Sequence, residues 1–303
     1  MSGNTEIIFK NVRDFSLERI FECGQAFRWK REDGGGYKGV AGGRAASVTF
    51  APSLRDPYAG ELTVTERGRA LRAHSGTETG DRAFWENYFD LKRDYGEINR
   101  ALSANDETMA RAIACGEGIR ILNQDAWETL ISFIISQNNN IPRIKGCIER
   151  LCKGFGERIE CAEGELFFDF PNARTLASLS EEDLAPCGLG YRAKYLCVTA
   201  RQVAKEGGTA WLDGLRGAAF SKAKTSLLSL CGVGEKVASC ILLFGLGQTE
   251  SFPLDVWMNR ALSELYGIDT KNAVNRAAAR FGPYAGIAQQ YIFYYMRKLA
   301  GIS

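Results

Sequence analysis

The spacing of apolar residues changes along the chain, and this change constrains the fold more than any other feature. Before about residue 82, short runs rich in β-branched and aromatic residues are bounded by Gly, Asp and Pro, which is typical of strands. These runs cover 26–33, 36–42, 45–52 and 61–67, and Gly34 to Gly36 predicts a hairpin turn between the first two. From Phe84, Tyr88 and Leu91 onward, the spacing of three and four residues predicts helices.

The remainder of the chain is predicted to be mostly helical, with short turns that contain Gly or Pro. The expected helices cover 126–137, 141–155, 191–206, 219–229, 235–246, 255–266 and 284–299, and GELFFDFP at 164–171 is the exception. We expect a boundary near 118, just before the long apolar helix from Trp127 to Ile135. The sequence therefore predicts an α+β fold: an N-terminal antiparallel sheet domain with helices over 1–118, and a helical domain over 119–303.

The composition indicates an ordinary globular chain. Hydrophobic residues make up 45% and charged residues 24% of the 303 residues, so the chain can bury a core without disulfides. It has no apolar stretch of 18 residues, so we expect no membrane span, and its first residues lack the pattern of a secretory signal. We expect a monomer.

The cysteines and the single histidine limit the possible chemistry. Nine cysteines occur at irregular spacing, with no C-x-x-C pair, so neither a zinc site nor an iron–sulfur cluster is expected. Free thiols indicate a reducing, intracellular compartment, which would be the nucleoid-associated cytoplasm in a bacterium. His74 lies in a polar stretch and is expected to be a solvated loop residue, so catalysis by a histidine base is not expected.

Positive charge is concentrated in one part of the helical domain. The formal net charge is only +2, but residues 186–245 carry eight basic and three acidic residues. This local excess fits either a surface that faces phosphates or a solvated face of a helical domain, and charge alone does not separate the two.

The segment 225–257 is the most informative. An apolar helix ends at Cys231, Gly232 to Gly234 form a tight turn, and a second helix begins at Glu235. The glycines allow close backbone approach, and the start of the second helix offers free N–H groups to a phosphate. A Gly-x-Gly turn alone is more often a packing corner without a ligand, and the spacing here is not that of a P-loop.

Two ionisable residues flank this turn. Lys236 lies in the first turn of its helix, where the helix dipole disfavours a cation, and partial burial there would favour the neutral, nucleophilic amine. Cys240 lies four residues later on the same face. Asp255 is a predicted N-cap of the next helix, and it is alternatively a carboxylate that stabilises developing positive charge.

The turn and its surroundings resemble a known family. The segments CGVGEKVASC and PLD resemble the helix-hairpin-helix glycosylases with a Gly/Pro-rich loop and an aspartate, and the flanking residues resemble the 8-oxoguanine DNA glycosylases in particular. Five segments match in order along nearly the whole chain: 23–29, 136–143, 188–193, 231–240 and 282–289. The sequence lacks the cysteine quartet of the iron–sulfur relatives.

The resemblance implies a bifunctional N-glycosylase and abasic-site lyase that acts on double-stranded DNA containing oxidised guanine. It implies that Lys236 attacks C1′ of the extruded nucleotide, that Asp255 supports this attack, and that an imine permits β-elimination without a metal or cofactor. Gly24 would accept the N7–H of the oxidised base on its carbonyl oxygen. Gln289 would contact the Watson–Crick edge, and Phe293 and Cys240 would contact the two faces of the ring.

The resemblance also implies a DNA-binding surface with a preference for cytosine opposite the lesion. Asn138, Arg143 and Arg192 match positions that contact the estranged cytosine, and Tyr191 matches the wedge beside it. Gly232, Gly234 and Trp257 would face the DNA backbone. Trp257 stands where many members have a histidine, and its indole donates one hydrogen bond but carries no charge.

Two other classes of function are open at this point. In a non-catalytic helix-hairpin-helix module, Lys236 would only contact a phosphate. A lesion-general alkylbase glycosylase would lack this lysine.

Overall fold

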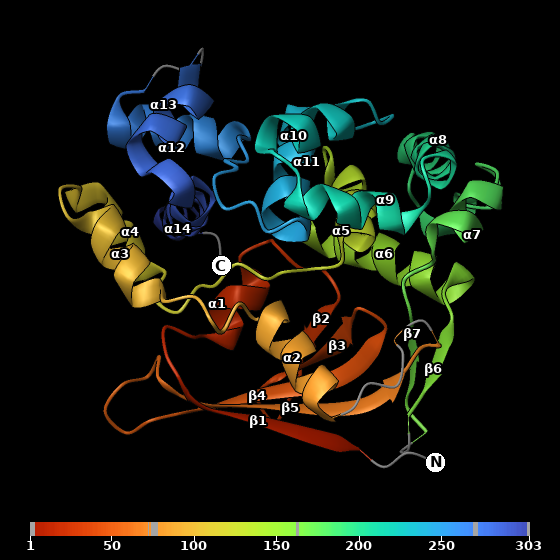
Figure 1. Ribbon diagram of the computed structural model, residues 1–303, viewed down its shortest axis with the longest axis horizontal. Coiled ribbons are helices and arrows are strands. Elements are labelled where there is room, and N and C mark those ends of the chain that lie inside the picture. Colours follow the sequence, from red (N-terminus) through yellow and green to blue (C-terminus); the bar gives the residue numbers. More distant parts are fainter. Residues whose placement is uncertain (1–3, 72, 74–77, 162–163, 269–271, 302–303) are drawn as a thin grey trace.

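The structure is a computed structural model, and it describes residues 4–71, 73, 78–161, 164–268 and 272–301. His74 lies outside the described residues. The chain forms an antiparallel sheet followed by a mostly helical part (Figure 1), which confirms the predicted fold class.

The sheet has five antiparallel strands in the order β1-β5-β4-β3-β2. The strands are β1 (Thr5–Val12), β2 (Trp29–Arg31), β3 (Tyr37–Ala41), β4 (Arg44–Pro52) and β5 (Gly60–Arg69). The expected strands are confirmed, and the edge strand β1 is an addition to them. One face buries apolar side chains such as Val48 and Val64, which are direct cross-strand partners.

Two helices cover this apolar face. Helix α1 (Leu17–Glu22) contributes Phe21 to the core, and α2 (Glu78–Tyr88) lies across the sheet (Figure 1) and contributes Trp85. Helix α2 ends before Leu91, because Asp90 adopts a left-handed conformation with φ of 51°.

The helical part follows the predicted pattern closely. Seven helices begin and end within one residue of the expected ranges, if α11 is taken together with the π-helical turn Ile241–Gly245 that continues it. They are α5 (Ala126–Ser136), α6 (Ile141–Phe155), α8 (Arg192–Lys205), α10 (Phe220–Leu228), α11 (Glu235–Cys240), α12 (Val256–Tyr266) and α14 (Ala285–Leu299). Five more helices are α3 (Tyr95–Ser103), α4 (Glu107–Cys115), α7 (Ala173–Ser178), α9 (Thr209–Gly214) and α13 (Ala273–Phe281).

Short elements complete the chain. Among the described residues, 3₁₀ turns occur at Ala185–Cys187, Leu215–Gly217 and Gly282–Tyr284, and a two-stranded hairpin consists of β6 (Arg158–Glu160) and β7 (Leu166–Phe168). Strand β7 lies within the segment 164–171 that was expected to depart from helix. No helix among the described residues is long and apolar enough to span a bilayer.

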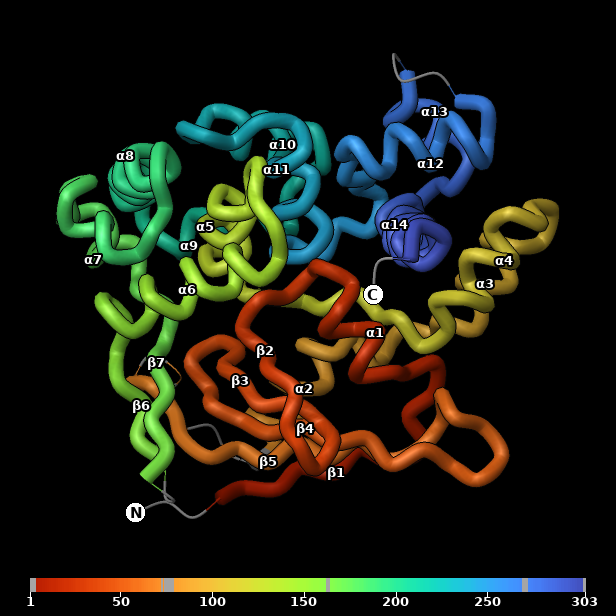
Figure 2. The backbone as a smooth tube through the Cα atoms, turned by 180° about the vertical axis from the view of Figure 1, so that it is seen from behind, coloured from red at the N-terminus to blue at the C-terminus, as the bar shows by residue number. Residues whose placement is uncertain are grey.

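The two parts of the chain exchange elements across the expected boundary. Helices α3 and α4 precede residue 118 but lie beside α14 in both views of the backbone (Figures 1 and 2), and they share its hydrophobic core. Conversely, β6 and β7 belong to the helical part in sequence and lie against β5 and β3. The division at residue 118 therefore describes chain order, and as a domain boundary it stays a proposal.

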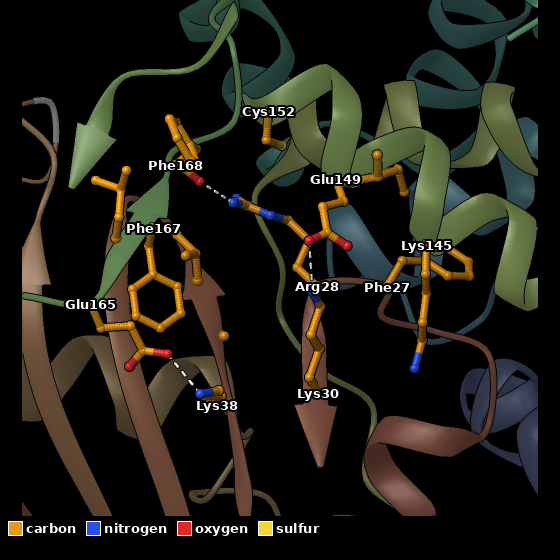
Figure 3. Close-up of a pocket in the computed structure, with 14 residues that line it drawn as sticks. Phe27, Arg28, Lys30, Lys38, Lys145, Glu149, Cys152, Glu165, Phe167 and Phe168 are labelled. Carbon is orange, nitrogen blue, oxygen red and sulfur yellow. Dashed lines mark hydrogen bonds and ion pairs between the residues drawn. The ribbon is translucent and has the colours of Figure 1, made fainter. Parts of the chain in front are cut away.

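Arg28 ties the sheet to the helical part. Its guanidinium is 3.3 Å from the Glu128 carboxylate. It also donates to the main-chain carbonyl of Phe168 (Figure 3). Nearby, Lys38 on β3 pairs with Glu165 at 2.6 Å. The Arg28 contacts hold the segment just before β2, which carries Phe27 and leads back to Gly24.

Candidate active site

The helix-hairpin-helix consists of α10, the turn at 229–234 and α11. Gly232 has φ of +73°, and a Cβ atom there would lie 2.7 Å from the ring of Tyr195, so the position requires glycine. Gly234 forms the N-cap of α11, and a Cβ there would meet no atom within 4 Å. Open space at Gly234 leaves the start of α11 accessible from outside.

Lys236 lies in the first turn of α11 and is partly buried. Its ammonium lies over the ring of Phe133 on α5, 5.0 Å from the centroid. The ring of Phe133 in turn stacks on Phe244, with centroids 5.5 Å apart and planes at 14°. Phe244 belongs to the π-helical turn, so this irregularity of the helix supports the surface on which the lysine rests.

A cleft beside Lys236 brings residues from distant parts of the sequence together. Its outer part and an inner recess share Gly24, Phe133, Lys236, Asp255 and Phe293 as walls. Trp257 lines the outer part, whereas Cys240 and Gln289 line the recess. The predicted catalytic and substrate-binding residues therefore meet in one place.

Asp255 has both features predicted for it. Its Oδ1 accepts the main-chain N–H of Met258 at 2.8 Å, so it is the N-cap of α12. It is also part of the cleft wall that contains Lys236. The cap bond holds the carboxylate at the start of α12, in the cleft that Lys236 also lines.

The recess combines a planar apolar surface with unused hydrogen-bonding capacity. Gln289 is 5% exposed, and its side-chain oxygen has no hydrogen-bond partner among the described residues. Phe293 lies one turn further along α14, and a Cβ atom on Gly24 would be 3.7 Å from its ring. Burial raises the pKa of the Cys240 thiol, and the nearby Lys236 charge opposes this rise.

The Gly24 loop is held by two buried glutamines. Gln25 donates to the carbonyl oxygens of Ile20 and Arg120 at 3.0 and 2.8 Å, and its side-chain oxygen accepts from the Leu122 N–H at 2.9 Å. Gln290 on α14 donates to the Cys23 carbonyl at 2.7 Å. Neither glutamine was predicted from the sequence to support the site, although Gln25 lies inside one of the matched segments.

A second group of predicted residues lies around the turn after α5. Asn138 is exposed with φ of 47°, and its side-chain amide is 3.4 Å from the hydroxyl of Tyr191, which is 52% exposed. Arg143 is exposed in the first turn of α6. These three side chains are available to a partner that covers this surface.

Arg192 differs from its neighbours because it is only 3% exposed. Its guanidinium donates to the carbonyl oxygens of Gln137, Asn138 and Leu189, and it stacks 4.5 Å over the ring of Tyr191. Arg192 therefore holds the loop that presents Asn138, and its guanidinium also packs on the neighbouring ring of Tyr191.

Comparisons with known proteins agree with this arrangement. The family model for the N-terminal domain of 8-oxoguanine DNA glycosylase matches residues 7–130, and that for HhH-GPD superfamily base excision DNA repair proteins matches residues 131–283. The chain is 32% identical to the N-glycosylase/DNA lyase OGG1 of Arabidopsis thaliana, over 92% of this chain and 77% of the relative. It is 38% identical to the N-glycosylase/DNA lyase of Saccharomyces cerevisiae, over 89% and 74%.

A solved structure is similar over almost the whole chain. It is the Clostridium acetobutylicum 8-oxoguanine glycosylase/lyase in complex with double-stranded DNA containing cytosine opposite 8-oxoguanine. It has 34% identity and a TM-score of 0.86, with 97% of this chain and 96% of that chain covered. The chain therefore belongs to the 8-oxoguanine DNA glycosylases of the HhH-GPD base-excision repair superfamily and is, like the relatives named above, a bifunctional N-glycosylase/DNA lyase.

Proposed function

We propose that this chain extrudes 8-oxoguanine from duplex DNA, excises it by attack of Lys236 on C1′, and cleaves the resulting abasic strand, with a preference for cytosine opposite the lesion. The observation that carries this proposal is the cleft in which Lys236, Asp255, Gly24 and Gln289 meet. A module that only binds DNA has no need for a recess with an unpartnered buried amide beside a lysine.

The base would be recognised by a buried side-chain oxygen and by a main-chain carbonyl oxygen of the cleft. The buried side-chain oxygen of Gln289 can accept an N–H of the Watson–Crick edge of guanine, and this would relieve the cost of burying it unpaired. The Gly24 carbonyl can accept the N7–H that 8-oxoguanine has and guanine lacks. Guanine would present a lone pair instead, at a cost of roughly 1–3 kcal/mol. The base must leave the stack to reach these groups.

The chemistry needs only the side chains of the cleft. The lone pair of the Lys236 nitrogen forms a bond to C1′ while the bond from C1′ to the base breaks, and the base leaves with the electron pair and takes up a proton from the nitrogen. The bond from C1′ to O4′ then breaks, O4′ takes up a proton, and the nitrogen and C1′ become a protonated imine. Loss of a C2′ proton forms a C2′–C3′ double bond and breaks the bond from C3′ to oxygen, so the 3′ phosphate leaves by β-elimination. The Asp255 carboxylate, fixed by its cap bond, would stabilise the positive charge that develops on the sugar.

Borohydride reduction tests the proposal, because it makes an imine between enzyme and DNA permanent. A duplex with 8-oxoguanine opposite cytosine should become covalently linked to the chain, whereas an undamaged duplex of the same sequence should not. Binding of the lesion duplex without any covalent product would instead support the non-catalytic module.

A further inference from the structure

Gln137 lies between the loop after α5 that carries Asn138 and the hairpin turn at 229–234 that leads to Lys236. It follows the C-terminus of α5, directly before Asn138. Its side-chain amide donates to the carbonyl of Gly232 at 2.9 Å and to that of Ile134 at 3.2 Å. The first of these bonds reaches the hairpin four residues before Lys236.

The main-chain carbonyl of the same residue is bound from the other side. It accepts Nε of Arg192 at 2.8 Å and a second, shorter bond from the same guanidinium, and the Tyr191 hydroxyl lies 3.5 Å away. Gln137 is thus held by the residues expected beside the estranged base, and it holds the turn that leads to Lys236.

Helix α8 fixes the hairpin independently. Thr199 donates to the Cys231 carbonyl, and the Gln202 side-chain oxygen accepts the Cys231 N–H at 2.8 Å. The Tyr195 ring fills the space beside Gly232. These contacts hold Cys231 and Gly232 against α8, and Gln137 is a separate, direct link between the loop and the hairpin.

We propose that Gln137 is a positioning residue that couples the loop facing the opposite base to the placement of Lys236. A DNA contact made by Arg192 or Asn138 changes the donors around the Gln137 carbonyl, and the side-chain bond to Gly232 carries this change to the hairpin. The inference rests on the proposed function and adds to it a route by which the opposite strand influences the chemical step.

A double-mutant cycle tests this coupling. Gln137→Met keeps the length of the side chain but removes the donor, and Arg192→Lys keeps the charge but removes the paired bonds to the loop. The quantity measured is the rate of borohydride-trapped adduct formation at saturating enzyme. We expect each single variant to be slower by about tenfold, and the double variant to be no slower than the slower single one.

A matched control separates this link from general loosening of the hairpin. Gln202→Met removes a bond to the same turn but touches no part of the Asn138 loop, so its effect should multiply with that of Arg192→Lys. Affinity for the lesion duplex, measured in a Lys236→Gln background, should change less than about twofold with Gln137→Met. If Gln137→Met does not fold, Gln137→Asn shortens the amide and serves in the same cycle.

Each outcome decides the question. The coupling would be overturned if the reductions in trapping rate caused by Gln137→Met and Arg192→Lys multiply in the double variant. It would also be overturned if Gln137→Met forms the adduct at the wild-type rate. If the effects of Gln202→Met and Arg192→Lys also fail to multiply, the connection between the loop and the hairpin runs through α8 and not through Gln137. A wild-type chain that forms no adduct would overturn the proposed function itself, which is a different result from any of these.

Discussion

Gln290 donates its side-chain amide to the main-chain carbonyl of Cys23 at 2.7 Å, across 267 positions of sequence. The bond joins α14, which carries Gln289 and Phe293, to the loop that carries Gly24. Gln290 is 2% exposed, so water does not compete for this contact. This buried bond therefore helps to place the groups expected to bind the edge, the face and N7 of the base relative to one another.

Gln290→Leu should impair base recognition more than strand cleavage. The change leaves the Cys23 carbonyl buried and unpaired, which should lower the free energy of unfolding by roughly 1–3 kcal/mol. Single-turnover excision of 8-oxoguanine should fall, whereas lyase activity on a preformed abasic duplex should be nearly retained, because no base has to be bound there. An equal loss on both substrates would show that Gln290 matters only for stability.

The sequence predicted the helices well because their ends carry local signals. Asp125, Asn140 and Asp255 each cap the following helix with a side-chain oxygen, as their residue types predict. The core position of α3 and α4 beside α14 could not be predicted in this way, because it depends on contacts between segments far apart in the chain.

The candidate site was predictable to a similar extent. Lys236 and Asp255 lie near a recognisable turn, and the resemblance pointed to Gly24, Cys240, Gln289 and Phe293, which line the same cleft. Phe133, whose ring lies under Lys236, was not predicted. The roles of Gln290 and Gln137 were not predictable, because an amide that binds a distant carbonyl has no local pattern. Burial of Arg192 was also unexpected, since arginine in a basic segment is usually exposed.

Lys236→Gln should abolish excision and borohydride trapping together, because an amide cannot form the imine. Affinity for the lesion duplex should be retained within a fewfold, since the cleft and the hairpin are unchanged. Lys222→Gln is the matched control, because Lys222 is an exposed lysine on α10 outside the cleft. Trapping of Lys236→Gln at the wild-type rate would assign the nucleophile to another amine.

Asp255→Asn should separate the two roles of this residue. Asparagine is also a good N-cap, so the melting temperature should stay within a few degrees of wild type. Loss of the charge should lower single-turnover excision by at least about tenfold, since charge stabilisation in active sites is often worth more than that. Unchanged excision would reduce Asp255 to a structural cap.

Stability should fall at alkaline pH in a way that depends on Cys23. Burial raises the pKa of the Cys23 thiol from about 9 to about 11, although hydrogen bonds involving Gln290 and Gln25 lower it in part. Because the folded state keeps the proton that the unfolded state releases, the stabilisation is complete below pH 9 and is lost as the pH rises toward 11. The melting temperature of Cys23→Ala should therefore fall less steeply over this interval than that of wild type, and Cys115→Ala serves as the control. Equal slopes for wild type and Cys23→Ala would contradict this.

Arg143 should contribute to the choice of the opposite base, because it is exposed in the first turn of α6, whereas Arg192 is buried and bound to main-chain carbonyls. A guanidinium can donate to O2 and N3 of cytosine, whereas adenine would set its own amino group against these donors. Arg143→Ala should therefore narrow the ratio of excision rates opposite cytosine and adenine. Arginine that only binds phosphate would lower both rates equally, and the exposed Lys194→Ala should behave in that way. Equal wild-type rates opposite all four bases would rule out the proposed cytosine preference.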